Sequence, residues 1–133
     1  MTELTAIKPT DSELEILQIL WSKGPSTVRA VNDLLVRDKE VGYTTTLKIM
    51  QIMTEKGLVS RNKQSRTHIY TANIDRDKCQ GALLNRFLEN TFSGSASSLV
   101  MQTLGNHTAS VDELKQIKEL IEKLENGDGE SDS

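Results

Sequence analysis

The chain has 133 residues, of which 36% are hydrophobic and only 4% aromatic, so aliphatic side chains must fill its core. That length suits one compact domain or two small ones, and no apolar run reaches the roughly 20 residues that span a bilayer. The single cysteine, Cys79, excludes an internal disulfide, and Met1–Thr5 lacks the basic and apolar pattern of a secretory signal. A cytoplasmic protein is therefore expected.

The net charge of -3 conceals a difference between the two halves of the chain. Residues 1–73 contain ten Lys and Arg against eight Asp and Glu, whereas residues 74–133 contain six against eleven. The first half therefore tolerates a phosphate-bearing partner, and the second half would repel one.

The first half begins with three predicted helices. Thr10 and Glu13 have the spacing of a capping box, which opens a helix that Gly24-Pro25 ends. Ser26 is expected to cap a second helix that runs to about Val36. A third helix is predicted over residues 43–56, and Gly57 occupies the left-handed position that follows it.

The hydrophobic period then changes from helical to alternating. Residues 58–61 and 67–71 are predicted strands, and the polar, basic segment 62–66 joins them as the tip of a hairpin. Three short helices followed by a hairpin predict a winged helix-turn-helix domain over residues 1–73.

The second half is predicted to be helical. Asp75 can cap a helix that Ser93–Ser95 breaks, a short apolar helix follows over 99–104, and Gly105-Asn106 ends it. Ser110 and Glu113 form a second capping box before the last helix, and residues 126–133 are predicted to be a disordered acidic tail. The fold class is therefore mainly α with a small β-hairpin, with an N-terminal winged helix-turn-helix and a C-terminal helical domain over 74–125.

The helices of the second half have apolar faces that are too wide to bury within about 50 residues. They could pack against one another and the winged domain, but we favour a homodimer in which two chains interlock them. On the last helix, the apolar spacings of three, four and three match the seam of a coiled coil. The predicted dimerisation residues are Leu84, Phe87, Leu88, Leu99, Leu104, Leu114, Ile117, Ile121 and Leu124.

The first half has the residues that a DNA-binding surface requires. A helix-turn-helix places the start of its second helix in the major groove, where hydroxyls and lysine can contact phosphates or base edges. Free N–H groups at a helix start bind phosphate, and basic side chains on a wing can follow the backbone or enter a minor groove. Threonine caps and a solvated turn would explain the same residues without DNA. The predicted DNA-binding residues are Ser26, Thr27, Tyr43, Thr44, Thr45, Lys48, Arg61, Lys63 and Arg66.

Together these segments resemble the penicillinase-repressor family of bacterial regulators, which includes BlaI, MecI and CopY proteins. The similar segments are residues 10–21, 26–32, 43–50, 55–59 and 98–101, and the resemblance spans about residues 8–125. It implies a winged helix, a helical dimerisation domain and repression by operator occupancy. A homodimer with two-fold symmetry would require a palindromic operator in double-stranded DNA, with half-sites about one helical turn or a multiple apart. The resemblance also implies DNA contacts from Tyr43, Thr44, Thr45 and Lys48 at the start of the third helix, and from Lys63 and Arg66 on the wing.

Two departures from that family concern its regulation. Copper-responsive members have paired cysteines near the C-terminus, which this chain lacks, so no metal or other cofactor is predicted. β-Lactam-responsive members are cleaved at an Asn-Phe bond in the short middle helix, and the matching positions here are Gln102 and Thr103. A regulatory protease is therefore a candidate partner, at a bond of different chemistry.

Two other classes of function agree less well with the sequence. An enzyme is not expected, because a lone cysteine and two histidines are usually structural and the sequence lacks a glycine-rich phosphate loop and a metal-ligand cluster. A winged helix that binds proteins without DNA is the alternative, and its affinity would depend little on salt, whereas DNA binding weakens steeply as salt rises.

Overall fold

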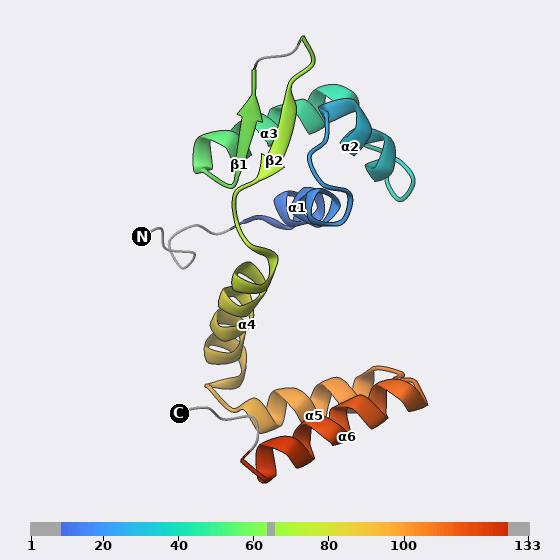
Figure 1. Cartoon of the computed structure of the whole chain (residues 1–133), viewed down its shortest axis with the longest axis vertical. Helices are drawn as coiled ribbons and strands as arrows, with labels where there is room; N and C mark the ends of the chain where they lie inside the picture. The colour runs from blue at the N-terminus through green and yellow to red at the C-terminus, as the bar shows by residue number, and fades with distance from the viewer. Residues whose placement is uncertain (1–8, 64–65, 128–133) are drawn as a thin grey trace. The chain divides into compact units, whose positions relative to one another are not determined.

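A computed structural model describes residues 9–63 and 66–127 of the chain (Figure 1). Residues 1–8, 64–65 and 128–133 lie outside the described residues, and with them most of the predicted tail, the centre of the wing tip and the N-terminal start. The described elements, in chain order, are α1 (Asp11–Lys23), α2 (Val28–Leu35), α3 (Tyr43–Lys56), β1 (Val59–Asn62), β2 (Ile69–Ala72), α4 (Arg76–Phe92), α5 (Ala96–Asn106) and α6 (Val111–Glu125).

The order of these elements confirms the predicted fold class, which is mainly α with one antiparallel hairpin. The chain forms two compact units, Met1–Arg86 and Phe87–Ser133, which divide within α4. The first unit contains the winged helix: α1, α2 and α3 followed by the hairpin of β1 and β2 (Figure 1).

Local caps fix the ends of α1 and α3 as predicted. Thr10 Oγ1 accepts from Glu13 N at 3.1 Å, and Glu13 Oε1 accepts from Thr10 N at 3.0 Å, which completes the capping box. Gly57 ends α3 with φ 84° and ψ 8°, a left-handed conformation that suits glycine because it has no Cβ.

The predicted cap of α2 is wrong by one residue. Thr27, not Ser26, is the N-cap, and its Oγ1 accepts from Ala30 N at 3.1 Å. Ser26 instead exchanges backbone hydrogen bonds with Tyr70 at 3.0 and 2.8 Å, so it extends the sheet beside β2. This pairing with a residue far along the chain holds Ser26 outside the helix.

The hairpin is slightly displaced from its predicted position. The predicted strands 58–61 and 67–71 are observed as Val59–Asn62 and Ile69–Ala72, with Val59 opposite Ala72 and Asn62 opposite Ile69. In this register Val59 and Tyr70 are buried, so each strand turns one face toward the helices.

The core of the first unit combines aliphatic and sulfur-containing side chains from the three helices and the start of the hairpin with one tyrosine from β2. α1 contributes Ile16, Leu17 and Leu20, and the remaining buried members are Val28, Val31, Leu35, Met50, Met53, Leu58, Val59 and Tyr70. Because α1, α2, α3 and the hairpin all bury a face in this cluster, the core fixes which faces of α2 and α3 remain outside.

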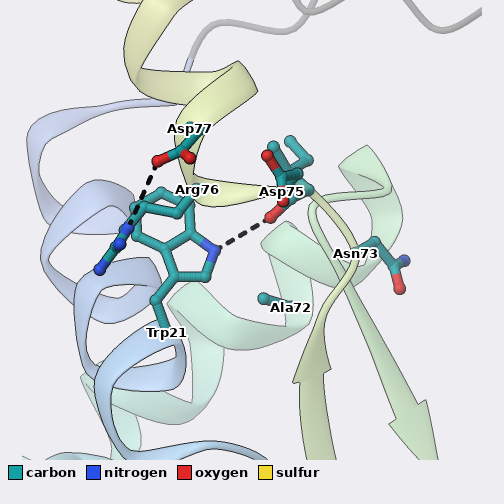
Figure 2. Close-up of a pocket in the computed structure, with 7 residues that line it drawn as sticks. Trp21, Ala72, Asn73, Asp75, Arg76 and Asp77 are labelled. Atoms are coloured by element: carbon teal, nitrogen blue, oxygen red, sulfur yellow. Dashed lines mark hydrogen bonds and ion pairs between the residues drawn. The ribbon is translucent and has the colours of Figure 1, made fainter.

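Trp21 links the end of α1 to the segment that leads into α4. Its Nε1 donates to Ile74 O at 2.9 Å, and a shallow depression opens beside the indole (Figure 2). Asp75 then caps α4 as predicted, because its side chain accepts from Lys78 N at 3.1 Å.

The second unit contains the end of α4, α5 and α6. Ser93 and Gly94 both adopt positive φ after α4. Ser95 then caps α5 by accepting from Ser98 N at 3.2 Å. The predicted capping box of Ser110 and Glu113 opens α6.

The middle helix is longer than predicted. It was expected over 99–104 but extends from Ala96 to Asn106, and Gly105 lies within it. A glycine inside a helix costs only about 1 kcal/mol, so it does not have to end one. Within the described residues, no helix has both the length and the apolar character needed to cross a bilayer.

Candidate nucleic-acid interface

α3 separates a buried face from an exposed face within its first two turns. Thr46 is buried, as are Met50 and Met53 further along, and these residues pack α3 onto the domain. The predicted contact residues lie on the other side, where Tyr43, Thr44, Thr45 and Lys48 are all exposed. The start of α3 therefore presents hydroxyl groups and one ammonium group to solvent.

The N-terminus of α3 is also open at its backbone. Gly42 is the N-cap and has no side chain, so among the described residues the first N–H groups of the helix have no side-chain cap. These donors and the positive end of the helix dipole point in the same direction. An acceptor supplied from outside, such as a phosphate or a base edge, would satisfy them.

A groove of about 310 Å³ lies beside this helix start. Its walls come from three parts of the first unit: the beginning of α2, the beginning of α3 and the segment that leads into β2. The lining residues are Thr27, Val28, Arg29, Tyr43, Leu47, Arg66, Thr67, His68 and Tyr70. The groove thus brings three predicted contact residues, Thr27, Tyr43 and Arg66, together with Arg29.

Arg29 is a member of this site that the sequence analysis missed. Its guanidinium carbon lies 4.8 Å from the centre of the Tyr43 ring, a cation–π contact that joins α2 to α3. The local signal was its position two residues after the helix cap Thr27. The contact itself depends on tertiary structure, because Arg29 and Tyr43 meet only when α2 and α3 pack.

The two hydroxyls predicted at the start of α2 differ in what they can still bind. Ser26 Oγ donates to Gly24 O at 2.8 Å, so its proton is already used within the chain. Thr27 Oγ1 accepts from Ala30 N and lines the groove. Because that contact uses only an acceptor site of the hydroxyl, its proton can still be donated. Thr27 is therefore the better placed of the two for an anion.

The basic residues of the wing occupy different environments. Arg61 lies on β1 opposite Tyr70 and is half-buried, and among the described residues its Nε is a buried side-chain nitrogen that has no hydrogen-bond partner. Lys63 and Arg66 are exposed on either side of the undescribed positions Gln64 and Ser65. Arg66 also lines the groove, so it faces the same space as Arg29.

The predicted dimerisation residues all keep accessible surface in the single chain. Five are exposed, namely Leu84, Phe87, Leu114, Ile121 and Leu124, and four are half-buried, namely Leu88, Leu99, Leu104 and Ile117. Neither α5 nor α6, both described in full, contains a buried residue. Val111 at the start of α6 is 82% exposed and Met101 on α5 is 71% exposed. Large apolar side chains left exposed along these helices are typical of an interaction face.

The candidate cleavage positions and the single cysteine also have clear positions. Gln102 and Thr103 are exposed on α5, and Thr103 Oγ1 donates to Leu99 O at 2.7 Å. Cys79 is buried on α4, and this burial raises the pKa of its thiol, a shift that the charge of Arg86 opposes only in part. A raised thiol pKa disfavours the thiolate that a cysteine nucleophile needs.

The chain is similar along most of its length to known repressors. It is 24% identical over 117 residues to the penicillinase repressor of Bacillus licheniformis, which covers 88% of this chain and 91% of that protein. It is 28% identical over 131 residues to the transcriptional regulator BlaI of Mycobacterium tuberculosis, and this match covers 97% of this chain and 92% of that protein. The solution structure of the DNA binding domain of the repressor BlaI matches 57% of this chain and 90% of that domain, with 24% identity and a TM-score of 0.49. The sequence model of the penicillinase repressor family matches residues 9–123, so this chain belongs to that family.

Proposed function

We propose that this chain is a transcriptional repressor that binds double-stranded DNA as a homodimer on an inverted-repeat operator. The observation that carries the proposal is the start of α3, where Tyr43, Thr44, Thr45 and Lys48 are exposed while Thr46 of the same turns is buried. In a helix-turn-helix, this is the segment that enters the major groove. Threonine hydroxyls and the lysine ammonium can contact base edges there, and a threonine methyl can contact thymine.

The groove beside α3 supports contact with the DNA backbone. Arg29 and Arg66 both line it, and Thr27 adds a hydroxyl at the start of α2. Arginine binds phosphate with good geometry, so two arginines that line one groove suit an anionic ligand. We propose that a phosphate of the DNA strand beside the major groove occupies this groove. Lys63 and Arg61 on the neighbouring wing would contact the DNA backbone as well.

The second unit supports a homodimer. Its helices expose leucine, isoleucine, valine and methionine side chains that a second copy of the same chain would cover. A two-fold axis would pair identical α3 helices, and such dimers bind half-sites one helical turn of DNA, or a multiple, apart. A dimer would cover the exposed apolar side chains. It would also contact two half-sites, which gives an operator long enough to be specific.

The proposed function is tested by fluorescence anisotropy of labelled duplexes with the full chain. A duplex selected by this chain from a randomised library should contain an inverted repeat and should bind more tightly than a shuffled duplex of the same composition. Affinity should also fall steeply as salt rises, because each phosphate contact releases counterions. A flat salt dependence with no preferred duplex would support the alternative, a winged helix that binds only proteins.

A regulatory protease is the further partner that we propose. Cleavage between Gln102 and Thr103 would separate α6 from α4, and these positions are exposed on α5. If the dimer depends on α6, such a cut would weaken binding to both half-sites together. Inserting a site for a sequence-specific protease between these two residues tests the idea, because cleavage should then release the selected duplex.

A further inference from the structure

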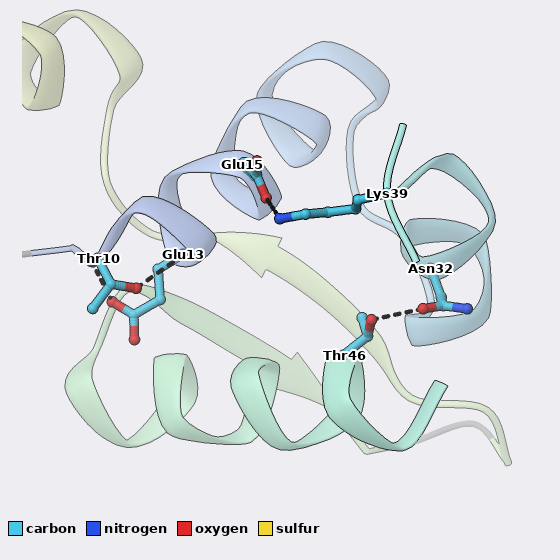
Figure 3. A network of polar contacts seen from close by, with 6 residues as sticks. All are labelled: Thr10, Glu13, Glu15, Asn32, Lys39 and Thr46. Carbon is cyan, nitrogen blue, oxygen red and sulfur yellow. Dashed lines mark hydrogen bonds and ion pairs between the residues drawn. The ribbon is translucent and has the colours of Figure 1, made fainter. Parts of the chain in front are cut away.

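Asn32 is a buried polar residue on α2 that faces the beginning of α3. It is only 8% exposed, and one end of its amide lies 3.2 Å from Val41 O, 3.3 Å from Gly42 O and 2.7 Å from Thr46 Oγ1. Carbonyl oxygens can only accept hydrogen bonds, so the amide nitrogen must be the atom at this end. Asn32 therefore donates to the turn before α3 and to Thr46 Oγ1 within it; Figure 3 marks this Asn32–Thr46 contact with the amide drawn in the opposite orientation, its oxygen toward Thr46.

These contacts lie at the start of α3, where Val41 and Leu47 are only partly buried against the core and Arg29 contacts Tyr43. Gly42 provides no side-chain cap, and the fully buried apolar residues of α3, Met50 and Met53, belong to its second half. In the first turn the buried side chain is Thr46, which is 0% exposed and bonded to Asn32. The fully buried side chain of the first turn is thus held by a polar contact, whereas the fully buried side chains of the second half are held by apolar packing.

The same contacts lie next to the exposed residues that we propose to contact bases. Gly42 directly precedes Tyr43, and Thr46 directly follows Thr45. A shift of the first turn that follows loss of the Asn32 amide would move the exposed hydroxyls with it. Base contacts need correct geometry, whereas phosphate contacts tolerate displacement because they depend mainly on charge.

We propose that Asn32 is a positioning residue for DNA recognition, which fixes the first turn of α3 so that the chain distinguishes its operator from other duplexes. The inference rests on the proposed function and adds a residue that does not touch DNA. Asn32 acts through Thr46 and the carbonyls of the preceding turn. Its loss should therefore reduce discrimination between duplexes more than general affinity for DNA.

The test compares the full-length chain with its Asn32→Ala variant by anisotropy on two duplexes, the one selected by the wild-type chain and its shuffled counterpart. We expect the ratio of the two affinities to fall by about tenfold or more, as for the loss of one good base contact. Affinity for the shuffled duplex should stay within about twofold, because phosphate contacts are retained. Circular dichroism at the same temperature reports the folded fraction. If Asn32→Ala does not fold, Asn32→Ser takes its place in the comparison.

Variants of Thr46 and of α1 separate positioning from general destabilisation. Thr46→Val removes the hydroxyl at nearly constant shape and should lower the ratio as Asn32→Ala does, while Thr46→Ser keeps the hydroxyl and should preserve it. Ile16→Val reduces core packing on α1 and should leave the ratio unchanged. An unchanged ratio in both Asn32→Ala and Thr46→Val overturns this inference alone. A wild-type chain without any preferred duplex overturns the proposed function as well.

Discussion

The guanidinium of Arg29 on α2 lies 4.8 Å from the centre of the Tyr43 ring at the start of α3. The contact places a permanent positive charge at the edge of the proposed recognition surface, in the groove that Arg66 also lines. A tyrosine face attracts the cation and limits its movement, so less side-chain freedom is lost when a phosphate binds.

Replacement of Arg29 by alanine should weaken binding to every duplex by a similar factor. If Arg29 contacts one phosphate, the slope of log affinity against log salt should become shallower by about 0.9. Anisotropy titrations at several salt concentrations measure this change. Arg37→Ala is the matched control, because Arg37 carries the same charge in the turn after α2 and does not line the groove. Equal effects of the two variants would contradict a specific role for Arg29.

Lys48 extends from the exposed face of α3, one turn after Thr44 and Thr45. Lys48→Ala should reduce the salt slope if the ammonium group contacts phosphate, or relax the preference at one base pair by about 1–3 kcal/mol if it contacts a base. Competition with single-base variants of the selected duplex distinguishes the two results. Lys23→Ala, at the end of α1, provides the control. Unchanged affinity and unchanged base preference would exclude Lys48 from the interface.

Features that depend on neighbouring residues were predictable from the sequence. The Thr10–Glu13 capping box is complete within four residues, and Gly57 takes up the left-handed conformation that the end of a helix requires. The bounds of α3 were therefore predicted correctly. Since α3 carries the proposed base contacts, the exposed residues of the candidate site could also be named from helical spacing.

Features that depend on distant residues were missed. Ser26 pairs with Tyr70 across the domain, which moved the α2 cap to Thr27. Arg29 joins the site only because α2 packs against α3, and the bond between Asn32 and Thr46 has the same origin. Both Ser26 and Thr27 are suitable caps, so only long-range pairing decides between them.

Glu13 and Lys56 form an ion pair that crosses the winged domain from α1 to the end of α3. Lys56 Nζ lies 2.7 Å from Glu13 Oε1, and the Glu13 side chain is almost completely buried. Lys56→Met should lower the free energy of unfolding by about 2 kcal/mol, because a buried carboxylate loses its charged partner. Urea denaturation followed by circular dichroism measures the loss.

A second substitution identifies the cause of that loss. Glu13→Gln combined with Lys56→Met removes both charges and should recover part of the stability, since no unpaired charge then remains buried. A double variant that is as unstable as the sum of the single variants would show that the two residues act independently.

The thiol of Cys79 should react slowly in the folded chain. Burial raises the pKa of this thiol, so little thiolate forms near neutral pH, and the sulfur is also shielded from reagents. Labelling with a maleimide, followed by mass spectrometry, should be slow in buffer and fast in denaturant. Because the folded state disfavours the thiolate, the stability contributed by the protonated thiol should be lost as pH rises above the pKa of the unfolded thiol. Fast labelling of the folded chain would contradict the burial of Cys79.

Charge placed on the apolar face of α6 should dissociate the proposed dimer without unfolding the subunit. Leu114 and Ile121 are 42% and 46% exposed in the single chain, so glutamate at either position remains partly hydrated there. In an interface the same carboxylate would lose water without gaining a partner, which is costly. Sedimentation equilibrium should therefore show a monomer for Leu114→Glu and Ile121→Glu, and a dimer for Gln116→Glu on another face of the helix. Intact dimers in both seam variants would exclude this face of α6 from the interface.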